Sequence, residues 1–171
     1  NEEIPDEIIR TSIDEMKKFR QGENNFNPQI LLLFIYFIEI VLITQSNNPK
    51  YYNEDNFKLF LIILNSVSLK FPQIDMFKKK ITKCLKVFME KVPVQYEEIS
   101  KGISNNSFVL RSQPNTPEYL NELMKIARHG ILFPESIRKD HLKAAFNQLV
   151  EFNNETHDKK IKFLNHIFCE W

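Results

Sequence analysis

Glycine is scarce in this chain, with three residues among 171. Glycine supplies the positive φ angles of tight hairpin turns and lets a backbone approach a phosphate group closely. Its scarcity therefore argues against a β-rich fold and against a glycine-rich nucleotide loop. Hairpin signals such as Asn-Gly are absent, and the apolar runs are too long for strands.

Net charge and cysteine are also low. The 23 basic and 22 acidic residues leave a formal net charge of +1, so no overall field attracts nucleic acid or an acidic membrane. Two cysteines, Cys84 and Cys169, provide no disulfide framework, and both lie in apolar helical patterns that favour buried thiols in a reducing compartment. We expect an intracellular protein, cytoplasmic or nuclear, without membrane contact. The missing initiator Met and a last residue inside a helical pattern lead us to expect a piece of a longer protein, or a processed chain.

The longest apolar run covers residues 30–43 and contains one charged residue, Glu39. It is shorter than the about 18 uninterrupted apolar residues of a membrane span. A helix that is apolar on every side is normally surrounded by other protein. The run therefore predicts a central helix that neighbouring helices enclose completely.

Apolar residues recur at helical spacing along most of the chain and predict seven to eight antiparallel helices. The starts are marked by proline and by capping residues, as at Thr116-Pro117-Glu118. The expected ends are marked by Gly22, Pro93 and Gly130. The expected helices cover about 5–21, 28–46, 54–70, 74–91, 96–103, 117–130, 134–153 and 156–171. Residues 104–115 are polar and predict a loop, or a sub-unit boundary inside a single all-helical domain, 1–171.

Successive pairs of these helices recur at roughly 40 to 45 residues, a spacing that resembles the stacked helical hairpins of HEAT and armadillo repeats. The resemblance is architectural, because the pairs share no repeat consensus. It implies an all-α, HEAT/armadillo-like α-solenoid fragment. An irregular helical bundle is the alternative.

Residues capable of catalysis or metal binding form no informative pattern. Glu39 is a carboxylate inside an apolar run, and such a group usually faces a loop or pairs with a lysine or arginine of a neighbouring helix. His166 and Cys169 could share one helical face, but zinc would need two further ligands. No nucleophile elbow, phosphate loop or dinucleotide fingerprint is present. We therefore predict no enzyme activity, no catalytic residue, no metal site and no cofactor.

Two basic clusters are the most distinctive surface features. The first is the lysine face of the helix expected at 74–91, and the second lies further along the chain. As candidate partner-binding residues we take Lys78, Lys79, Lys80, Lys83, Lys86, Arg128, Arg138, Lys139 and Lys143. A solvated helix face is the ordinary explanation of such lysine runs.

The function that fits these features is protein–protein interaction without catalysis. We expect a scaffold domain of a larger protein that receives a peptide or helix of a partner, with the lysines steering an acidic or amphipathic segment. Nucleic-acid binding through the lysine-rich face of residues 78–91 is the alternative, and a helical enzyme is the second alternative. No small-molecule ligand is predicted.

Overall fold

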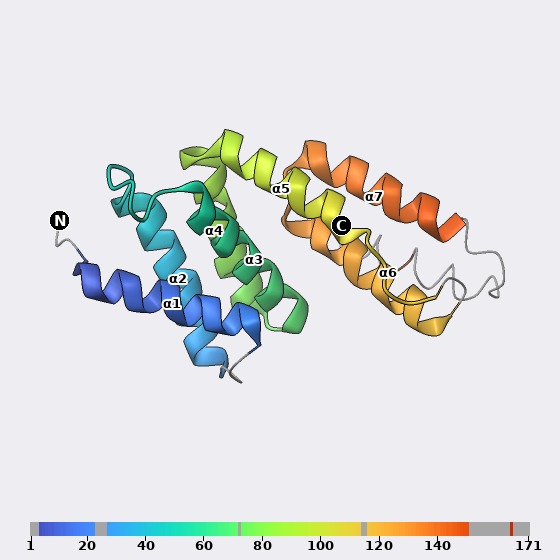
Figure 1. Ribbon diagram of the computed structural model, residues 1–171, viewed down its shortest axis with the longest axis horizontal. Coiled ribbons are helices and arrows are strands. Elements are labelled where there is room, and N and C mark those ends of the chain that lie inside the picture. Colours follow the sequence, from blue (N-terminus) through green and yellow to red (C-terminus); the bar gives the residue numbers. More distant parts are fainter. Residues whose placement is uncertain (1–3, 23–26, 72, 114–115, 151–164, 166–171) are drawn as a thin grey trace. The chain divides into compact units, whose positions relative to one another are not determined.

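The computed structural model describes residues 4–22, 27–71, 73–113, 116–150 and 165, and these residues contain no strand. The all-α prediction is confirmed. The helices are α1 (Asp6–Gln21), α2 (Pro28–Thr44), α3 (Glu54–Lys70), α4 (Asp75–Lys91), α5 (Pro93–Ser107), α6 (Pro117–His129), the 3-10 turn η1 (Gly130–Leu132) and α7 (Glu135–Val150) (Figure 1). The helix predicted at 156–171 lies outside the described residues.

Side-chain caps fix three of the helix starts. Asn27 accepts a hydrogen bond from the Ile30 amide at 3.0 Å, and Asn53 caps α3 in the same way through the Asn56 amide. The Thr116 hydroxyl accepts from the amide of Tyr119, the third residue of α6, at 3.2 Å. Each cap satisfies an amide that has no partner inside its own helix.

The two glycines that were expected to end helices behave differently. Gly22 ends α1 with φ at 77°, a left-handed conformation that other residues adopt only with strain. Gly130 instead has φ at −63° and continues the chain from α6 into η1. The predicted glycine stops are therefore both confirmed, since Gly130 is the C-cap residue after His129, but only Gly22 adopts the left-handed conformation.

Helix α5 is longer at both ends than the predicted 96–103, and the predicted loop at 104–115 begins only after Ser107. Pro93 was taken only as the end of the preceding helix. It also begins the next one, because a first-turn residue needs no amide hydrogen bond. At the other end, the Ser107 hydroxyl donates to the Ser104 carbonyl at 2.7 Å. Serine and asparagine favour turns in sequence, so this last turn was missed.

The chain divides between Tyr96 and Glu97 into two compact units. In the first unit, α1 packs mainly on α3 and α2 packs mainly on α4. The start of α1 lies at the start of α3, where the Tyr51 hydroxyl donates to the Asp6 carboxylate. The end of α1 lies at the end of α3, where the Lys70 ammonium is 5.9 Å from the centre of the Phe19 ring. Helices α1 and α3 are therefore parallel.

Helices α2 and α4 are parallel for the same reason, since Lys80 contacts Tyr36 and Lys83 contacts Glu39. The first unit thus consists of two antiparallel hairpins, α1–α2 and α3–α4, packed on each other. Such packing occurs both in solenoids and in irregular bundles. The solenoid and its alternative therefore both stay predictions.

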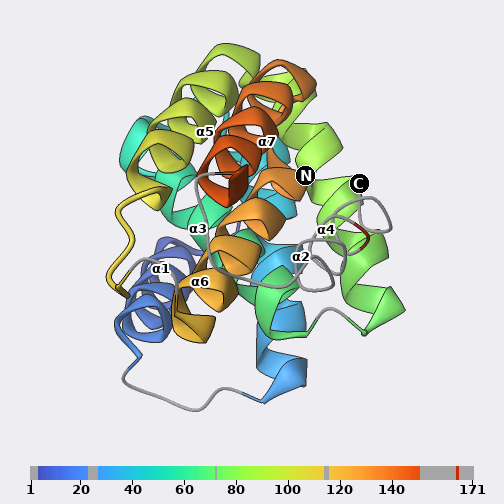
Figure 2. The ribbon, with the colours of Figure 1, turned by 90° about the vertical axis from the view of Figure 1, so that its right-hand side faces the viewer.

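The second unit contains α6, η1 and α7, with α5 from Glu97 onward. Helices α6 and α7 pack along each other in both views (Figures 1 and 2). Their shared core is apolar and includes Leu123, Ala127, Ala145 and Leu149. On α7 the buried residues follow the spacing Ile137, His141, Ala145, Leu149. The apolar pattern of the sequence also predicts an inward position for Phe146, and that prediction is wrong, because Phe146 is 44% exposed.

Candidate interaction surface

Helix α2 is not enclosed on every side, so that prediction is wrong for one face. Leu33 is 64% exposed, Ile43 47%, Ile40 42% and Tyr36 37%. We call these four residues the α2 row. The opposite side of the same helix, which includes Ile38, is fully buried against the unit.

The spacing of the α2 row explains why it forms one stripe. Its members lie three, four and three residues apart, so they share one face of the helix. The partners of α2 within its unit are α4, α1 and α3, and none of the described residues of the unit buries this face. Single exposed apolar residues are common on protein surfaces, whereas a contiguous row marks a contact surface.

Glu39 lies at the edge of the buried side and is 8% exposed. Its carboxylate is 2.7 Å from the Lys83 ammonium of α4, so the predicted pairing with a lysine of a neighbouring helix is confirmed. The hydrogen bond to Glu39 raises the pKa of Lys83 above its ordinary value. Lys83, a predicted partner-binding residue, therefore already serves to join α2 to α4.

The other lysines of α4 divide around the helix. The Lys80 ammonium lies 4.4 Å from the centre of the Tyr36 ring, a cation–π contact that covers part of the α2 row. Lys79, Lys83 and Lys86 share a helix face at spacings of four and three. Lys79 and Lys86 are exposed and form no ion pair within the described residues. Lys78, two positions from Lys80, projects from nearly the opposite side of α4.

The second predicted cluster belongs to the second unit and is used differently. The Arg138 guanidinium donates to the carbonyls of Ile131 at 3.3 Å and Phe133 at 3.1 Å, and so holds η1 and the residue after it against α7. Lys139 forms an exposed ion pair with Glu135 at 3.1 Å. The remaining members are Arg128, which is half-buried, and Lys143, which is exposed.

A buried histidine in the second unit was not identified from the sequence. His141 is 1% exposed, and its Nε2 donates to the Ile126 carbonyl at 2.6 Å. Its Nδ1 therefore accepts from the Ser104 hydroxyl, also at 2.6 Å. The rings of Phe108 and Phe133 complete the surroundings, with centres 4.9 and 5.1 Å from the imidazole.

This Ser–His pair joins three helices, because Ser104 lies on α5, Ile126 on α6 and His141 on α7. Both side chains of the pair are buried, so the geometry is that of a structural link. Burial lowers the pKa of His141, and burial lowers that of the neighbouring His129 to about 4. The sequence offered one indication of this buried histidine, since residue 141 lies four positions from both Ile137 and Ala145, on the buried face of α7.

The remaining candidates for chemistry are less informative. Cys84 is buried as predicted, and desolvation followed by the nearby Glu39 charge raises the pKa of its thiol far above the ordinary value. A thiol in that state is a poor nucleophile. Cys169 and the His166–Cys169 metal candidate lie outside the described residues.

Comparison with known proteins identifies no relative. The chain matches no protein-family model, no curated protein and no solved structure. Among the helices of the described ranges, none combines the length and the apolar character needed to cross a membrane. The features that indicate a function are therefore those of the protein surface.

Proposed function

We propose that this chain is a non-enzymatic interaction domain that binds an acidic, amphipathic helix of a partner protein along α2. The observation that carries the proposal is the α2 row, whose spacing of three and four residues is the spacing at which one helix meets another. A partner helix would place its own apolar residues between those of the row.

The lysines of α4 support an acidic partner. Lys80 contacts Tyr36 of the row. Lys79 and Lys86 share the helix face of Lys83, which pairs with Glu39 of α2. Charges at the rim of an interface select partners and accelerate encounter. Each large apolar side chain that becomes fully buried contributes about 1.5–3 kcal/mol, and association itself offsets a large part of that gain. We therefore expect a dissociation constant of about 1–100 μM.

The test is selection from a displayed library of helical peptides that carry apolar residues on one face and random charges elsewhere. Enriched peptides should be rich in glutamate and aspartate at the edges of the apolar face. Their binding is then measured by fluorescence anisotropy with the Leu33→Ser/Ile40→Ser variant, which we expect to weaken binding at least about tenfold.

Ile8→Ser is the matched control, because Ile8 is an exposed apolar residue of α1 outside the α2 row. It should leave the affinity within about twofold of the wild-type value. Equal losses in both variants, or a library without any binder tighter than about 1 mM, would remove the proposal.

Nucleic-acid binding is the second candidate, and the exposed charges of Lys79 and Lys86 favour it. The variant Lys79→Glu/Lys86→Glu tests it without disturbing the ion pair between Lys83 and Glu39. Nucleic-acid binding through this face requires an affinity for short RNA that falls steeply with salt and is lost in the variant. Salt-independent or undetectable binding rejects this candidate.

A further inference from the structure

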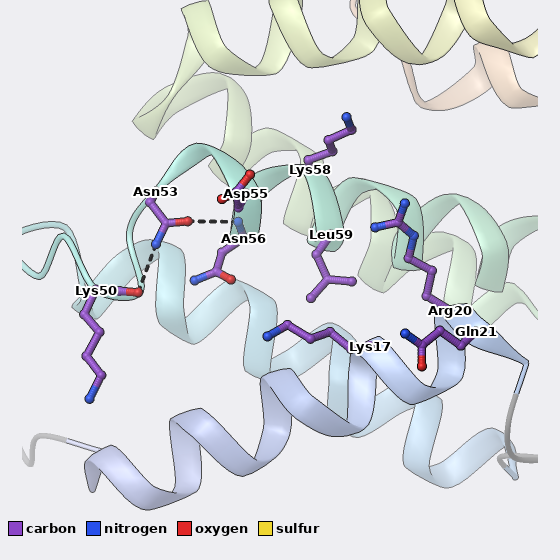
Figure 3. Close-up of a pocket in the computed structure, with 9 residues that line it drawn as sticks. All are labelled: Lys17, Arg20, Gln21, Lys50, Asn53, Asp55, Asn56, Lys58 and Leu59. Atoms are coloured by element: carbon purple, nitrogen blue, oxygen red, sulfur yellow. Dashed lines mark hydrogen bonds between the residues drawn. The ribbon is translucent and has the colours of Figure 1, made fainter.

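A groove of about 800 Å³ lies between α1 and the start of α3 (Figure 3). Four cationic side chains and one carboxylate take part in its lining, and its one apolar residue is Leu59. The cations are Lys17, Arg20, Lys50 and Lys58, and the carboxylate is Asp55. None of these residues belongs to the α2 row or to α4, so the groove is independent of the proposed function.

Two of the four cations already have acidic partners. The Lys50 ammonium is 2.6 Å from the Asp6 carboxylate, and the Lys17 ammonium is 3.5 Å from that of Asp14. Arg20 and Lys58 are exposed and form no ion pair within the described residues. Their positive charges are therefore available to a ligand.

The neutral polar groups of the groove are largely committed to the fold. The Asn53 side chain caps α3 and donates to the carbonyls of Pro49 and Lys50. The Asn56 amide nitrogen donates to the Tyr51 carbonyl at 2.9 Å. Recognition in the groove would therefore depend on charge, with Lys17 and Arg20 projecting from α1 and Lys58 from α3 (Figure 3).

This lining selects the class of ligand. Sites for drug-like or aromatic molecules are mostly apolar, whereas this groove has a single leucine. A guanidinium binds phosphate through two parallel hydrogen bonds, and ammonium groups add point charges around it. Asp55 would repel an anion, so the ligand is expected to contact Lys17, Arg20 and Lys58 and to avoid the part of the groove wall that Asp55 forms.

We propose that the groove binds a compact small molecule carrying two or more phosphate groups, held by Arg20, Lys17 and Lys58. Arg20 and Lys58 form no ion pair within the described residues, and Lys17 can exchange Asp14 for a ligand because that ion pair is exposed and long, at 3.5 Å. The three cations project from two different helices, which points to a ligand with more than one phosphate group. Such a ligand is a departure from the sequence-based expectation of no small-molecule ligand.

Inorganic tripolyphosphate is the probe, with orthophosphate and sulfate compared at equal ionic strength by isothermal titration calorimetry. Tripolyphosphate should bind at least about tenfold more tightly than either single anion. Arg20→Gln/Lys58→Gln should weaken tripolyphosphate binding at least about tenfold. Because both side chains are exposed, circular dichroism and the melting temperature should remain those of the wild type.

The matched control is Lys79→Gln/Lys86→Gln, which removes the same charge from α4 and should change the affinity less than about twofold. An equal loss in the control would assign the binding to overall charge and overturn the proposal. Equal affinity for orthophosphate, or no binding below about 1 mM at about 50 mM salt, would also overturn it. A further outcome is that a short single-stranded DNA binds far more tightly than tripolyphosphate, with that binding lost in the Arg20→Gln/Lys58→Gln variant. That result would overturn the small-molecule proposal and identify the groove as a nucleic-acid site.

Discussion

The two units of this chain differ in how their buried titratable side chains are held. The first unit has an aromatic and aliphatic core, in which Phe57 and Phe88 meet edge to face, and its buried carboxylate Glu39 is paired at the rim. The second unit places an imidazole in its centre and bonds both ring nitrogens. A buried side chain with both polar atoms hydrogen-bonded has few alternative arrangements. His141 therefore fixes α5, α6 and α7 of the second unit relative to one another.

Exposed apolar residues differ in the same direction. The first unit has further exposed apolar residues, such as Ile8 and Met76, but four of its exposed apolar residues form the α2 row on one helix face. Among the described residues of the second unit, the large exposed apolar ones are Phe146 and Val150 on α7 and Val109 in the segment after α5. Isolated exposed apolar residues need no explanation. The second unit is therefore held together by the hydrogen bonds of His141, whereas the first unit presents the α2 row as a contact surface.

Removal of the imidazole should produce the largest effect. His141→Ala leaves a cavity and takes the partners away from Ser104 and the Ile126 carbonyl, which together should cost about 4 kcal/mol. Hydrogen exchange would then show faster exchange of the amides in α6 and α7, while the amides of α2 and α3 keep their protection. The control is Phe146→Ala on the same helix, which should change stability by less than about 0.5 kcal/mol. Loss of protection in both units at once would show that the units unfold together.

Mild acid should destabilise the second unit more than the first, without any substitution. All four histidines lie after Tyr96, so the first unit has no imidazole to titrate. The folded pKa of His129, at about 4, is below the unfolded value of about 6.5, so its contribution is complete above pH 6.5 and is lost as pH falls toward 4. This loss amounts to about 2 kcal/mol at pH 5, and His141 adds to it in the same direction.

Hydrogen exchange measured during thermal unfolding, at pH 7 and at pH 5, compares the pH dependence of stability in the two units. The second unit should lose protection at pH 5 while the first retains it. Equal weakening of both units between these values would contradict the assignment, because the carboxylates titrate mainly at lower pH.

The ends of several helices could be predicted from single residues, because their chemistry is local. Asn53 and Thr116 cap helices with their own side chains, and Gly22 adopts a φ that its missing Cβ permits. Whether a face of α2 is covered depends on how many helices surround it, which the apolar run does not specify. The sequence predicted the kind of partner for Glu39, but not that Lys83 was that residue.

The candidate surface was only partly predictable for the same reason. The lysines of α4 were identified as a group, whereas their division around the helix follows from which residues face α2. Lys80 and Lys83 contact Tyr36 and Glu39, and these contacts depend on the parallel packing of two helices separated in the chain. His141 was missed because periodicity alone does not distinguish a bonded buried histidine from a surface one.

A smaller effect is expected for the ion pair of the first unit. Lys83→Met leaves the Glu39 carboxylate buried without its partner and should lower the melting temperature of the first unit by about 3 °C. Lys79→Met, an exposed lysine of the same helix, should change it by less than about 1 °C. Adding Glu39→Gln to Lys83→Met should recover most of the loss. No recovery would mean that Lys83 contributes through its hydrocarbon chain rather than through the ion pair.

Substitutions in the α2 row should cause the smallest change in stability. The contrast with the opposite, buried face of the same helix should be large. Leu33→Ser and Ile40→Ser remove side chains that are already in contact with water, so each should shift the free energy of unfolding by less than about 0.5 kcal/mol. Ile38→Ser, on the fully buried face, should cost at least about 3 kcal/mol, since it creates a cavity and buries a hydroxyl. Urea unfolding of the three variants measures both values. If Leu33→Ser proved as costly as Ile38→Ser, the row would be covered in solution, and a segment of the same chain or a second copy would already occupy the surface assigned to a partner helix.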